Sequence, residues 1–336
     1  MTEEAVPAMT TSLRVTFVTE AGSGVGLGHL RRCQALATAF SPRGVAVRFV
    51  IAGDVEIAGP GVARVDWTRD PRRARAALAA WRADVVVVDS YSAGAGLLES
   101  LQALAACVVA VDDLADRPLP AHLIVNGAYH APRLAYRGRP DSVFLLGPDY
   151  ALLDPAFGEA PQRSPRDEVR RVLVTFGGDP LVAGTDAAVR AVRRAAPAAA
   201  IDLVLGPGAP APAGAGECLT VHRGLDSLRR LMLDADLAVT GGGMTLYECL
   251  ATGTPVVGMC LADNQRPNLD ELGGAGLILT GEPSLEAALG RLAGDPSLRR
   301  AMSARGRQVV DGRGAARVVD EIRRACVAVG AAPGAR

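Results

Sequence analysis

Short apolar runs alternate with helical patterns along most of the chain. In the first half, we expect strands at 13–19, 45–51, 84–89, 108–112 and 123–126, and helices at 29–40, 71–83 and 97–106. The run 84–89 reads DVVVVD, which is typical of a strand buried on both faces of a parallel sheet. Strands and helices that follow one another in this order predict a doubly wound α/β sheet.

The second half repeats this alternation. We expect strands at 171–176, 201–205, 219–222, 235–240 and 255–259, helices at 185–195, 225–233, 245–251 and 264–275, and further helices across 284–329. Prolines interrupt the periodicity across 129–170. The pattern therefore predicts a disordered N-terminus over 1–12, a first domain over 13–150, a linker over 151–170, a second domain over 171–328 and a flexible tail over 329–336. Ligands of such sheets bind at the carboxyl ends of the strands, so we expect a cleft between the domains.

Length and composition agree with two ordinary domains. The chain has 336 residues, of which 49% are hydrophobic, and domains usually hold roughly 100–200 residues. Basic and acidic residues balance at 36 each, so no excess charge favours nucleic acid or an anionic membrane as a partner. The sequence contains no lysine, which excludes Schiff-base and lysine-base chemistry.

The sequence shows no pattern typical of a signal peptide, a membrane span, a zinc site or a dithiol site. The first twelve residues lack the apolar core of a signal peptide, and no apolar run reaches membrane-spanning length. The six cysteines include no CxxC pair, which disfavours zinc and dithiol sites. We expect a cytoplasmic protein with reduced thiols, no membrane insertion and no resident metal or cofactor.

A glycine-rich loop follows the first predicted strand and ends at a histidine. Gly26 and Gly28 precede His29 where the next helix begins. Glycines there let the backbone approach a ligand, and a helix start attracts anions. His29 is the only one of the four histidines at such a strand–helix junction, and an imidazole can accept a proton near neutral pH. The alternative is a histidine that only caps or packs against the helix.

Two further strand–glycine–helix junctions occur in the second half. Gly177 and Gly178 follow one predicted strand, and Gly242 and Gly243 follow another, before Met244, Thr245 and Glu248. Thr245 is expected to cap its helix, and the free N–H groups can bind a diphosphate without a metal. Each junction alone would fit a tight turn. Three of them at the carboxyl edges of the sheets favour phosphate binding.

Polar residues at other strand ends supply further candidates. Asn264 and Gln265 follow the strand at 255–259, and their amides suit sugar hydroxyls, unless they only start a helix. Asp89, with Asp112 and Asp113, ends strands of the first domain. Those carboxylates fit either magnesium or strand-end capping, and we favour capping, with Arg117 as a partner.

These motifs together resemble the GT-B glycosyltransferase family that contains the peptidoglycan N-acetylglucosaminyltransferase. They are more similar to the UDP-sugar hydrolase of the pseudaminic-acid pathway and to spore-coat polysaccharide proteins. The markers are G-x-G-H-L-R-R-C (26–33), D-S-Y (89–91), V-D-D-L-A-D-R (111–117), L-G-P-D-Y-A-L-L-D-P-A-F (146–157), T-F-G-G-D (175–179), T-G-G-G-M-T-L-Y-E (240–248) and N-Q (264–265).

The resemblance implies a GT-B fold: two Rossmann-like doubly wound parallel-sheet domains that face a cleft. It implies a first domain for the acceptor and catalysis and a second for a nucleotide-sugar. The residue roles it implies are activation of the nucleophile by His29, contact with the uracil edge near Leu225, diphosphate binding by Gly242, Gly243 and Thr245, ribose binding by Glu248 and sugar binding by Asn264 and Gln265. It implies no metal, and Tyr91 joins the candidate substrate-binding residues.

The sequence departs from the hydrolase pattern near the expected sugar and acceptor pocket. Val18-Thr19-Glu20 stands where the hydrolase has Arg-x-Asp, and Ser90 stands where it has histidine. We therefore expect a transferase that moves a sugar from a UDP-sugar to a small acceptor. A natural-product pathway, such as a cytosylglucuronate synthase of nucleoside antibiotics, is one candidate. A UDP-sugar hydrolase is the alternative, followed by an idle nucleotide-sugar-binding protein and an epimerase. The oligomeric state stays open.

Overall fold

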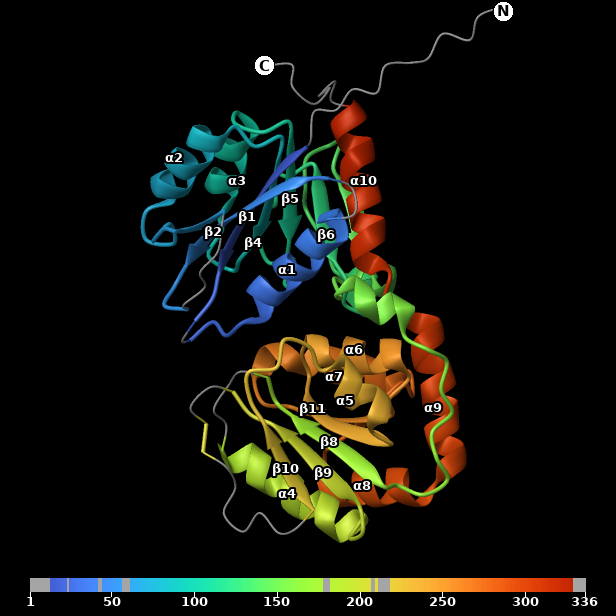
Figure 1. Ribbon diagram of the computed structural model, residues 1–336. Helices are drawn as coiled ribbons and strands as arrows, with labels where there is room; N and C mark the ends of the chain where they lie inside the picture. The colour runs from blue at the N-terminus through green and yellow to red at the C-terminus, as the bar shows by residue number, and fades with distance from the viewer. Residues whose placement is uncertain are drawn as a thin grey trace, which may run out of the picture.

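Two parallel sheets with helices on their faces make up the protein. The computed structural model describes residues 13–22, 24–41, 44–55, 61–177, 182–206, 209–210 and 218–328. The expected disordered ends, 1–12 and 329–336, lie outside these residues. Figure 1 shows the two sheets as separate layered bodies, one above the other, joined by two chain crossings.

The first sheet has seven strands in the order β3-β2-β1-β4-β5-β6-β7. They are β1 (Arg14–Glu20), β2 (Ala46–Ala52), β3 (Val62–Arg64), β4 (Val85–Asp89), β5 (Cys107–Val111), β6 (Leu123–Asn126) and β7 (Val143–Leu146). The helices α1 (Gly28–Phe40), α2 (Pro71–Trp81) and α3 (Ala95–Gln102) connect them. All the pairings are parallel, as the buried apolar runs predict.

The second sheet has six parallel strands in the order β10-β9-β8-β11-β12-β13. They are β8 (Arg171–Thr175), β9 (Ala200–Val204), β10 (Leu219–His222), β11 (Leu237–Gly241), β12 (Val256–Met259) and β13 (Leu279–Thr280). The helices in this half of the sequence are α4 (Val182–Ala195), α5 (Arg229–Asp234), α6 (Met244–Thr252), α7 (Arg266–Gly274), α8 (Leu285–Gly294), α9 (Pro296–Val309) and α10 (Gly314–Ala328). The expected doubly wound architecture is confirmed in both halves.

Strand order places the glycine-rich turns. In the first sheet, β1 lies between β2 and β4, and in the second, β8 lies between β9 and β11. At these positions the chain changes the direction in which it adds strands, so the connections on either side diverge. The turns after β1, β8 and β11 are therefore at the switch points where α/β proteins bind ligands.

Each sheet is buried on both faces. In β4, Val85 and Val87 point into one core, and Val86 and Val88 point into the core on the other face. Neighbouring side chains of a strand point to opposite faces, so an uninterrupted run of valines fills both cores. Two further cores cover the faces of the second sheet.

The C-terminal helix α10 belongs to the first domain. Its buried residues share a core with Val15 and Leu36, and they are Ala315, Val318, Val319, Ile322 and Cys326. Figure 1 shows α10 beside β5 and β6, away from the second sheet. The expected assignment of 171–328 to one domain therefore differs from the packing. An amphipathic pattern identifies the buried face of a helix but not the domain that covers it.

Three short strands were absent from the sequence expectations. β3, β7 and β13 have 3, 4 and 2 residues and lie at sheet edges, where runs are too short to show alternation. Among the described residues, no helix combines the length and apolarity that a membrane crossing requires.

Candidate functional site

The first turn of α1 holds His29 against a carboxylate from β4. His29 is 4% exposed, and its Nδ1 atom lies 2.6 Å from Asp89 Oδ1. Asp89 ends β4, the neighbour of β1 in the sheet. The switch point thus brings the end of β4 beside the helix that follows β1. The sequence analysis treated Asp89 only as a possible metal ligand or strand cap, so this pairing is new.

Arg32 determines the proton arrangement of the pair. Its Nε and Nη2 groups donate to Asp89 Oδ2 and Oδ1 at 3.0 and 2.8 Å, so Asp89 is held as an ionised acceptor. His29 then donates from Nδ1–H, so Nε2 is the ring nitrogen that can exchange a proton with a substrate. Arg32 Nη2 lies 3.0 Å from His29 Nδ1, but with this tautomer that contact is only a close approach. No hydrogen bond to Nε2 forms among the described residues.

A second carboxylate and a tyrosine complete the cluster. Arg32 Nη1 donates to both oxygens of Asp113 at 2.6 and 2.7 Å, and Tyr91 OH donates to Asp113 Oδ2 at 3.0 Å. Burial acts to raise the pKa of Asp113, but the charge of Arg32 and the hydrogen bonds hold this pKa below its ordinary value. The Tyr91 ring packs edge-on against His29, with centroids 4.4 Å apart. Tyr91 thus covers His29.

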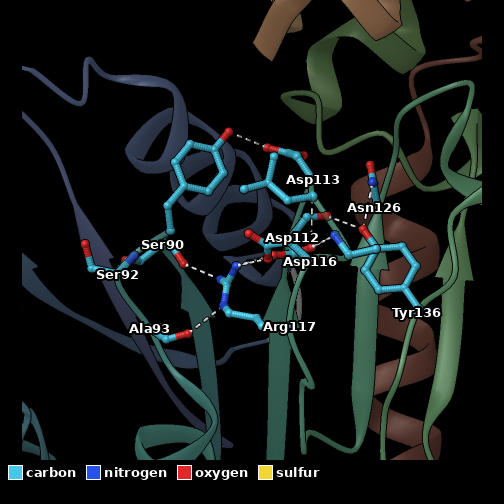
Figure 2. A network of polar contacts seen from close by, with 12 residues as sticks. Ser90, Ser92, Ala93, Asp112, Asp113, Asp116, Arg117, Asn126 and Tyr136 are labelled. Atoms are coloured by element: carbon cyan, nitrogen blue, oxygen red, sulfur yellow. Dashed lines mark hydrogen bonds and ion pairs between the residues drawn. The ribbon is translucent and has the colours of Figure 1, made fainter. Parts of the chain in front are cut away.

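Asp112 and Arg117 organise the loop after β5. Asp112 Oδ1 accepts from the N–H groups of Leu114 and Ala115 at 2.9 and 2.7 Å. Arg117 pairs with Asp112 Oδ2 at 3.2 Å and donates to the carbonyl of Ser90 at 3.1 Å. Figure 2 shows this network between the ends of β4 and β5. The expected strand-end capping and the pairing with Arg117 are confirmed for Asp112.

Two departures from the hydrolase pattern contact each other. Ser90 Oγ donates to Glu20 Oε1 at 2.5 Å, and Ser92 Oγ donates to Glu20 Oε2 at 3.0 Å. Glu20 ends β1 and is 5% exposed. The two substitutions therefore form one self-consistent polar pair beside His29 and Asp89.

The glycine turns leave open space where a ligand would need it. A side chain at Gly26, Gly28 or Gly177 would meet nothing within 4 Å. Gly26 and Gly177 have φ values of +77° and +78°, a region that glycine favours. Gly28 does not require such a φ, so neither packing nor backbone strain within the chain demands glycine there. Gly178 lies outside the described residues.

The turn before α6 is built differently at its two glycines. Gly242 is packed tightly, since a Cβ would lie 2.7 Å from Gln265 Cβ. Gly243 has a φ of −90° and open space around it. It is the N-cap of α6, and no side chain caps this helix. The expected cap from Thr245 is therefore wrong, because Thr245 lies inside the first turn beside Met244. No side chain of the described residues accepts from the first-turn N–H groups.

Gln265 supports the glycine turn. Its Oε1 accepts from the N–H of Gly242 at 2.9 Å and of Leu261 at 3.3 Å. Asn264 is exposed in a short 3-10 turn (Asp263–Gln265). Asn268, which the sequence analysis missed, donates from Nδ2 to the Gly242 carbonyl at 3.1 Å. The structure thus brings Gln265 and Asn268 to the turn before α6, whereas Asn264 forms no hydrogen bond within the described residues.

Glu248 lies on α6 opposite the first domain. Burial raises the pKa of its carboxyl to about 7, and Arg31 opposes this shift. Arg31, two residues after His29, donates from Nη1 to the carbonyl of Asp226 at 3.0 Å. Asp226 follows Leu225, which is partly buried in the loop between β10 and α5. The start of α1 therefore faces the part of the second domain that carries Leu225 and Glu248.

The domains also meet along a segment after β6. Tyr129 N–H donates to Tyr247 OH on α6 at 2.8 Å, and Arg133 forms an ion pair with Glu271 on α7. His130 lies between them, and burial lowers its pKa. His29 is therefore not the only histidine near the domain boundary. The position of His130 could not be predicted from the sequence, because the stretch 129–170 shows no periodicity.

Metal ligands do not cluster in the described part of the chain. No group of three or more His, Cys, Asp or Glu side chains there could hold an ion.

A hollow of about 660 Å³ lies at the carboxyl ends of β2 and β3, beside the first glycine turn, with Asp54, Arg64 and Asp66 in its lining.

Comparisons of the sequence find distant relatives. No family model matches the chain. It is 24% identical over 209 residues to an uncharacterised protein of Methanocaldococcus jannaschii, a match that spans 56% of this chain and 42% of that protein. It is 26% identical over 212 residues to the spore coat polysaccharide biosynthesis protein SpsG of Bacillus subtilis, across 58% of this chain and 62% of the relative. The matches thus span less than two thirds of either relative.

Comparisons of the structure cover nearly the whole chain. CalG4, the calicheamicin glycosyltransferase, superposes with a TM-score of 0.63 at 18% identity, over 94% of this chain and 98% of its own. MurG of Acinetobacter baumannii gives 0.60 at 17% identity, over 93% and 99%. A Listeria monocytogenes protein named for a UDP-N-acetylglucosamine 2-epimerase gives 0.59 at 16% identity, over 93% and 96%. The chain therefore has the GT-B fold, the two-domain α/β architecture of the glycosyltransferases to which it is similar.

Proposed function

We propose that this protein is a metal-independent glycosyltransferase that moves a sugar from a UDP-sugar to a small acceptor. The observation that carries this proposal is the buried His29–Asp89 pair, at 2.6 Å. The pair lies at the start of α1, which contacts the second domain through Arg31, and α6 in that domain starts without a side-chain cap. A base in one domain and an anion-binding helix start in the other are what the reaction needs.

The second domain would hold the donor. The N–H groups of Gly243, Met244 and Thr245 at the start of α6 bind the diphosphate, where the helix dipole favours negative charge. Glu248 accepts hydrogen bonds from the ribose hydroxyls, and the loop at Leu225 contacts the uracil. Gly177 gives the backbone of the β8 turn the same freedom to approach the donor.

The first domain would supply the base and the acceptor. His29 Nε2 takes the proton of the acceptor hydroxyl while the acceptor oxygen attacks the anomeric carbon. The bond from that carbon to the diphosphate oxygen breaks, and its electron pair leaves on UDP. Asp89 stabilises the imidazolium that forms, since its carboxylate accepts from Nδ1–H. Attack opposite to the leaving group inverts the anomeric configuration.

Two observations bear on the acceptor. The hollow beside the first glycine turn carries both acidic and basic side chains, which suits a polar small molecule. CalG4 is named for calicheamicin, a natural product, and a natural-product acceptor, as in nucleoside antibiotics of the cytosylglucuronate type, is our candidate. The protein would then work in the cytoplasm on soluble substrates.

The cover of Tyr91 over His29 favours one second candidate. His29 is 4% exposed, and water reaches such an imidazole more readily than a bulky acceptor does. With water as the nucleophile, the same groups would make a UDP-sugar hydrolase that releases free sugar and UDP.

One experiment separates the two candidates. The protein is incubated with a panel of UDP-sugars, with and without candidate acceptors, and the products are measured by mass spectrometry. UDP release that requires an acceptor is the expected result. Free sugar formed without an acceptor would indicate the hydrolase, and the absence of UDP release from every donor would contradict both.

A further inference from the structure

Three hydrogen bonds connect the first domain to the glycine turn before α6. Tyr129 N–H donates to Tyr247 OH at 2.8 Å. Tyr247 OH donates to Asn268 Oδ1 at 2.8 Å, and Asn268 Nδ2 donates to the carbonyl of Gly242 at 3.1 Å. The series starts just after β6, passes through α6 and α7, and ends one residue before the N-cap Gly243.

The direction of every bond in this series is determined. A backbone N–H only donates, so Tyr247 oxygen must accept from Tyr129 and use its own proton elsewhere. That proton goes to Asn268, whose amide must therefore present its oxygen to Tyr247 and its NH₂ to Gly242. Burial raises the pKa of Tyr247, so the hydroxyl keeps its proton. Loss of the hydroxyl would leave Asn268 Oδ1 without this donor, so that the amide would be held on this side only by its bond to the Gly242 carbonyl.

The Gly242 carbonyl belongs to the same peptide group as the N–H of Gly243, which we propose donates to the diphosphate. The carbonyl of Gly242 and the N–H of Gly243 belong to one planar trans peptide, so they point in opposite directions. Asn268 holds the carbonyl, which turns the N–H of Gly243 away from α7. Gln265 holds the other side of Gly242 through its N–H at 2.9 Å. Gly243 is exposed, and a side chain there would meet nothing within 4 Å, so the chain leaves room for a ligand beside this residue.

We propose that Tyr247 is a positioning residue that aims the Gly243 N–H at the diphosphate when the domains are in contact through Tyr129. This inference rests on the proposed function, because it takes the turn before α6 as the diphosphate site. Tyr247 is 2% exposed and acts only through Asn268. The contact between the domains thereby strengthens binding of the diphosphate, although neither Tyr129 nor Tyr247 touches the ligand.

The test is Tyr247→Phe, with UDP and uridine as probes. Calorimetric titration of the full chain should show UDP affinity reduced about tenfold, which corresponds to one lost hydrogen bond of about 1.4 kcal/mol. Uridine, measured by competition, should bind unchanged because it has no phosphate. A merely structural role would lower the affinity for both ligands or for neither.

Two further variants complete the design. Asn268→Asp keeps the shape but replaces the amide donor to Gly242, so it should reproduce the selective loss, and it carries the test if Tyr247→Phe does not fold. Tyr136→Phe is the matched control, because its hydroxyl also accepts from a neighbour, Asn126, and donates to a carbonyl, that of Asp112. Figure 2 shows this hydroxyl in the first domain, where both of its hydrogen-bond partners lie, so UDP affinity should not change.

The outcomes separate the two proposals. UDP binding that Tyr247→Phe leaves within twofold, or an equal loss for UDP and uridine, would overturn the positioning role alone. If the unaltered chain binds no UDP, the proposed function fails and the positioning role fails with it.

Discussion

The imidazole of His29 and the carboxylate of Asp89 lie 2.6 Å apart, although 60 residues separate them in the chain. The parallel pairing of β1 with β4 makes this contact, because both strands end at the same edge of the sheet. Arg32 and Asp113 surround the pair with compensating charge. The contact at Nδ1 leaves Nε2 as the ring nitrogen that can accept a proton, which is the arrangement that a general base requires.

Removal of the His29 imidazole should strongly reduce turnover but should not weaken binding of the nucleotide. We expect His29→Ala to lower kcat by about 10²–10⁴, the usual contribution of a general base. UDP affinity should stay nearly constant, because the proposed nucleotide contacts are all in the second domain. Steady-state kinetics and calorimetric titration with UDP provide the two numbers. Turnover that survives the substitution would remove His29 from this role.

Replacing the Asp89 carboxylate with a neutral amide should impair His29 as a base, because Asp89 holds the ring in the tautomer with the proton on Nδ1. Asp89→Asn can no longer hold Nδ1–H as a charged acceptor, so we expect kcat to fall by about 10³–10⁴ with little change in KM. Asp202→Asn is the matched control, because Asp202 is also buried between an arginine and a histidine, Arg171 and His222, but in the second sheet. A similar loss of kcat in both variants would mean that only stability is affected.

Glu248 should contribute to nucleotide affinity. If its carboxylate binds the ribose hydroxyls, Glu248→Ala should weaken UDP binding by about 1–3 kcal/mol, the usual cost of a charge-assisted hydrogen bond. Uridine should lose the same amount, since it carries the same ribose. Titration with both ligands measures this, and unchanged affinities would exclude the ribose role.

The raised pKa of Glu248 predicts a specific pH dependence of stability. The folded carboxyl keeps its proton up to pH about 7, whereas the unfolded one releases it above about pH 4.3. The folded state therefore binds more protons between these values, and its stability falls as pH rises through this window. Thermal unfolding of the unliganded protein and of Glu248→Gln should coincide near pH 4 and separate toward pH 7, with the glutamine variant more stable. Parallel curves would show that the carboxyl ionises normally.

Metal removal should leave the activity intact. The proposed site neutralises the leaving UDP with backbone N–H groups and the dipole of α6 rather than with an ion. Turnover measured in excess EDTA should match turnover in its absence. A loss that added magnesium restores would instead return Asp112 and Asp113 to consideration as ligands.

Much of the fold could be read from the sequence, because buried parallel strands and amphipathic helices have clear periods. The run 84–89 and the helix that starts at His29 were located within one or two residues. Three of the four edge strands, β3, β7 and β13, were not located, since two to four residues carry little periodicity, whereas the fourth, β10, was predicted at 219–222. The domain that α10 covers also depends on tertiary packing, which no local pattern encodes.

The candidate site was predictable only in part. Glycine turns and His29 stand out because the same strand–glycine–helix pattern occurs three times in the sequence and one of these junctions carries a histidine. The partners of His29 did not stand out: Asp89 and Arg32 become a base-orienting pair only through the order of the strands. Asn268 was missed because its role depends on the fold of α7 over the turn, and Thr245 was assigned a capping role that Gly243 holds.

A structure of the protein with UDP bound tests the central claim most directly. We predict that the diphosphate oxygens lie within about 3 Å of the N–H groups of Gly243 and Met244, with His29 on the opposite side of the site. A UDP molecule bound away from the turn before α6, or a His29 imidazole turned away from it, would contradict the account.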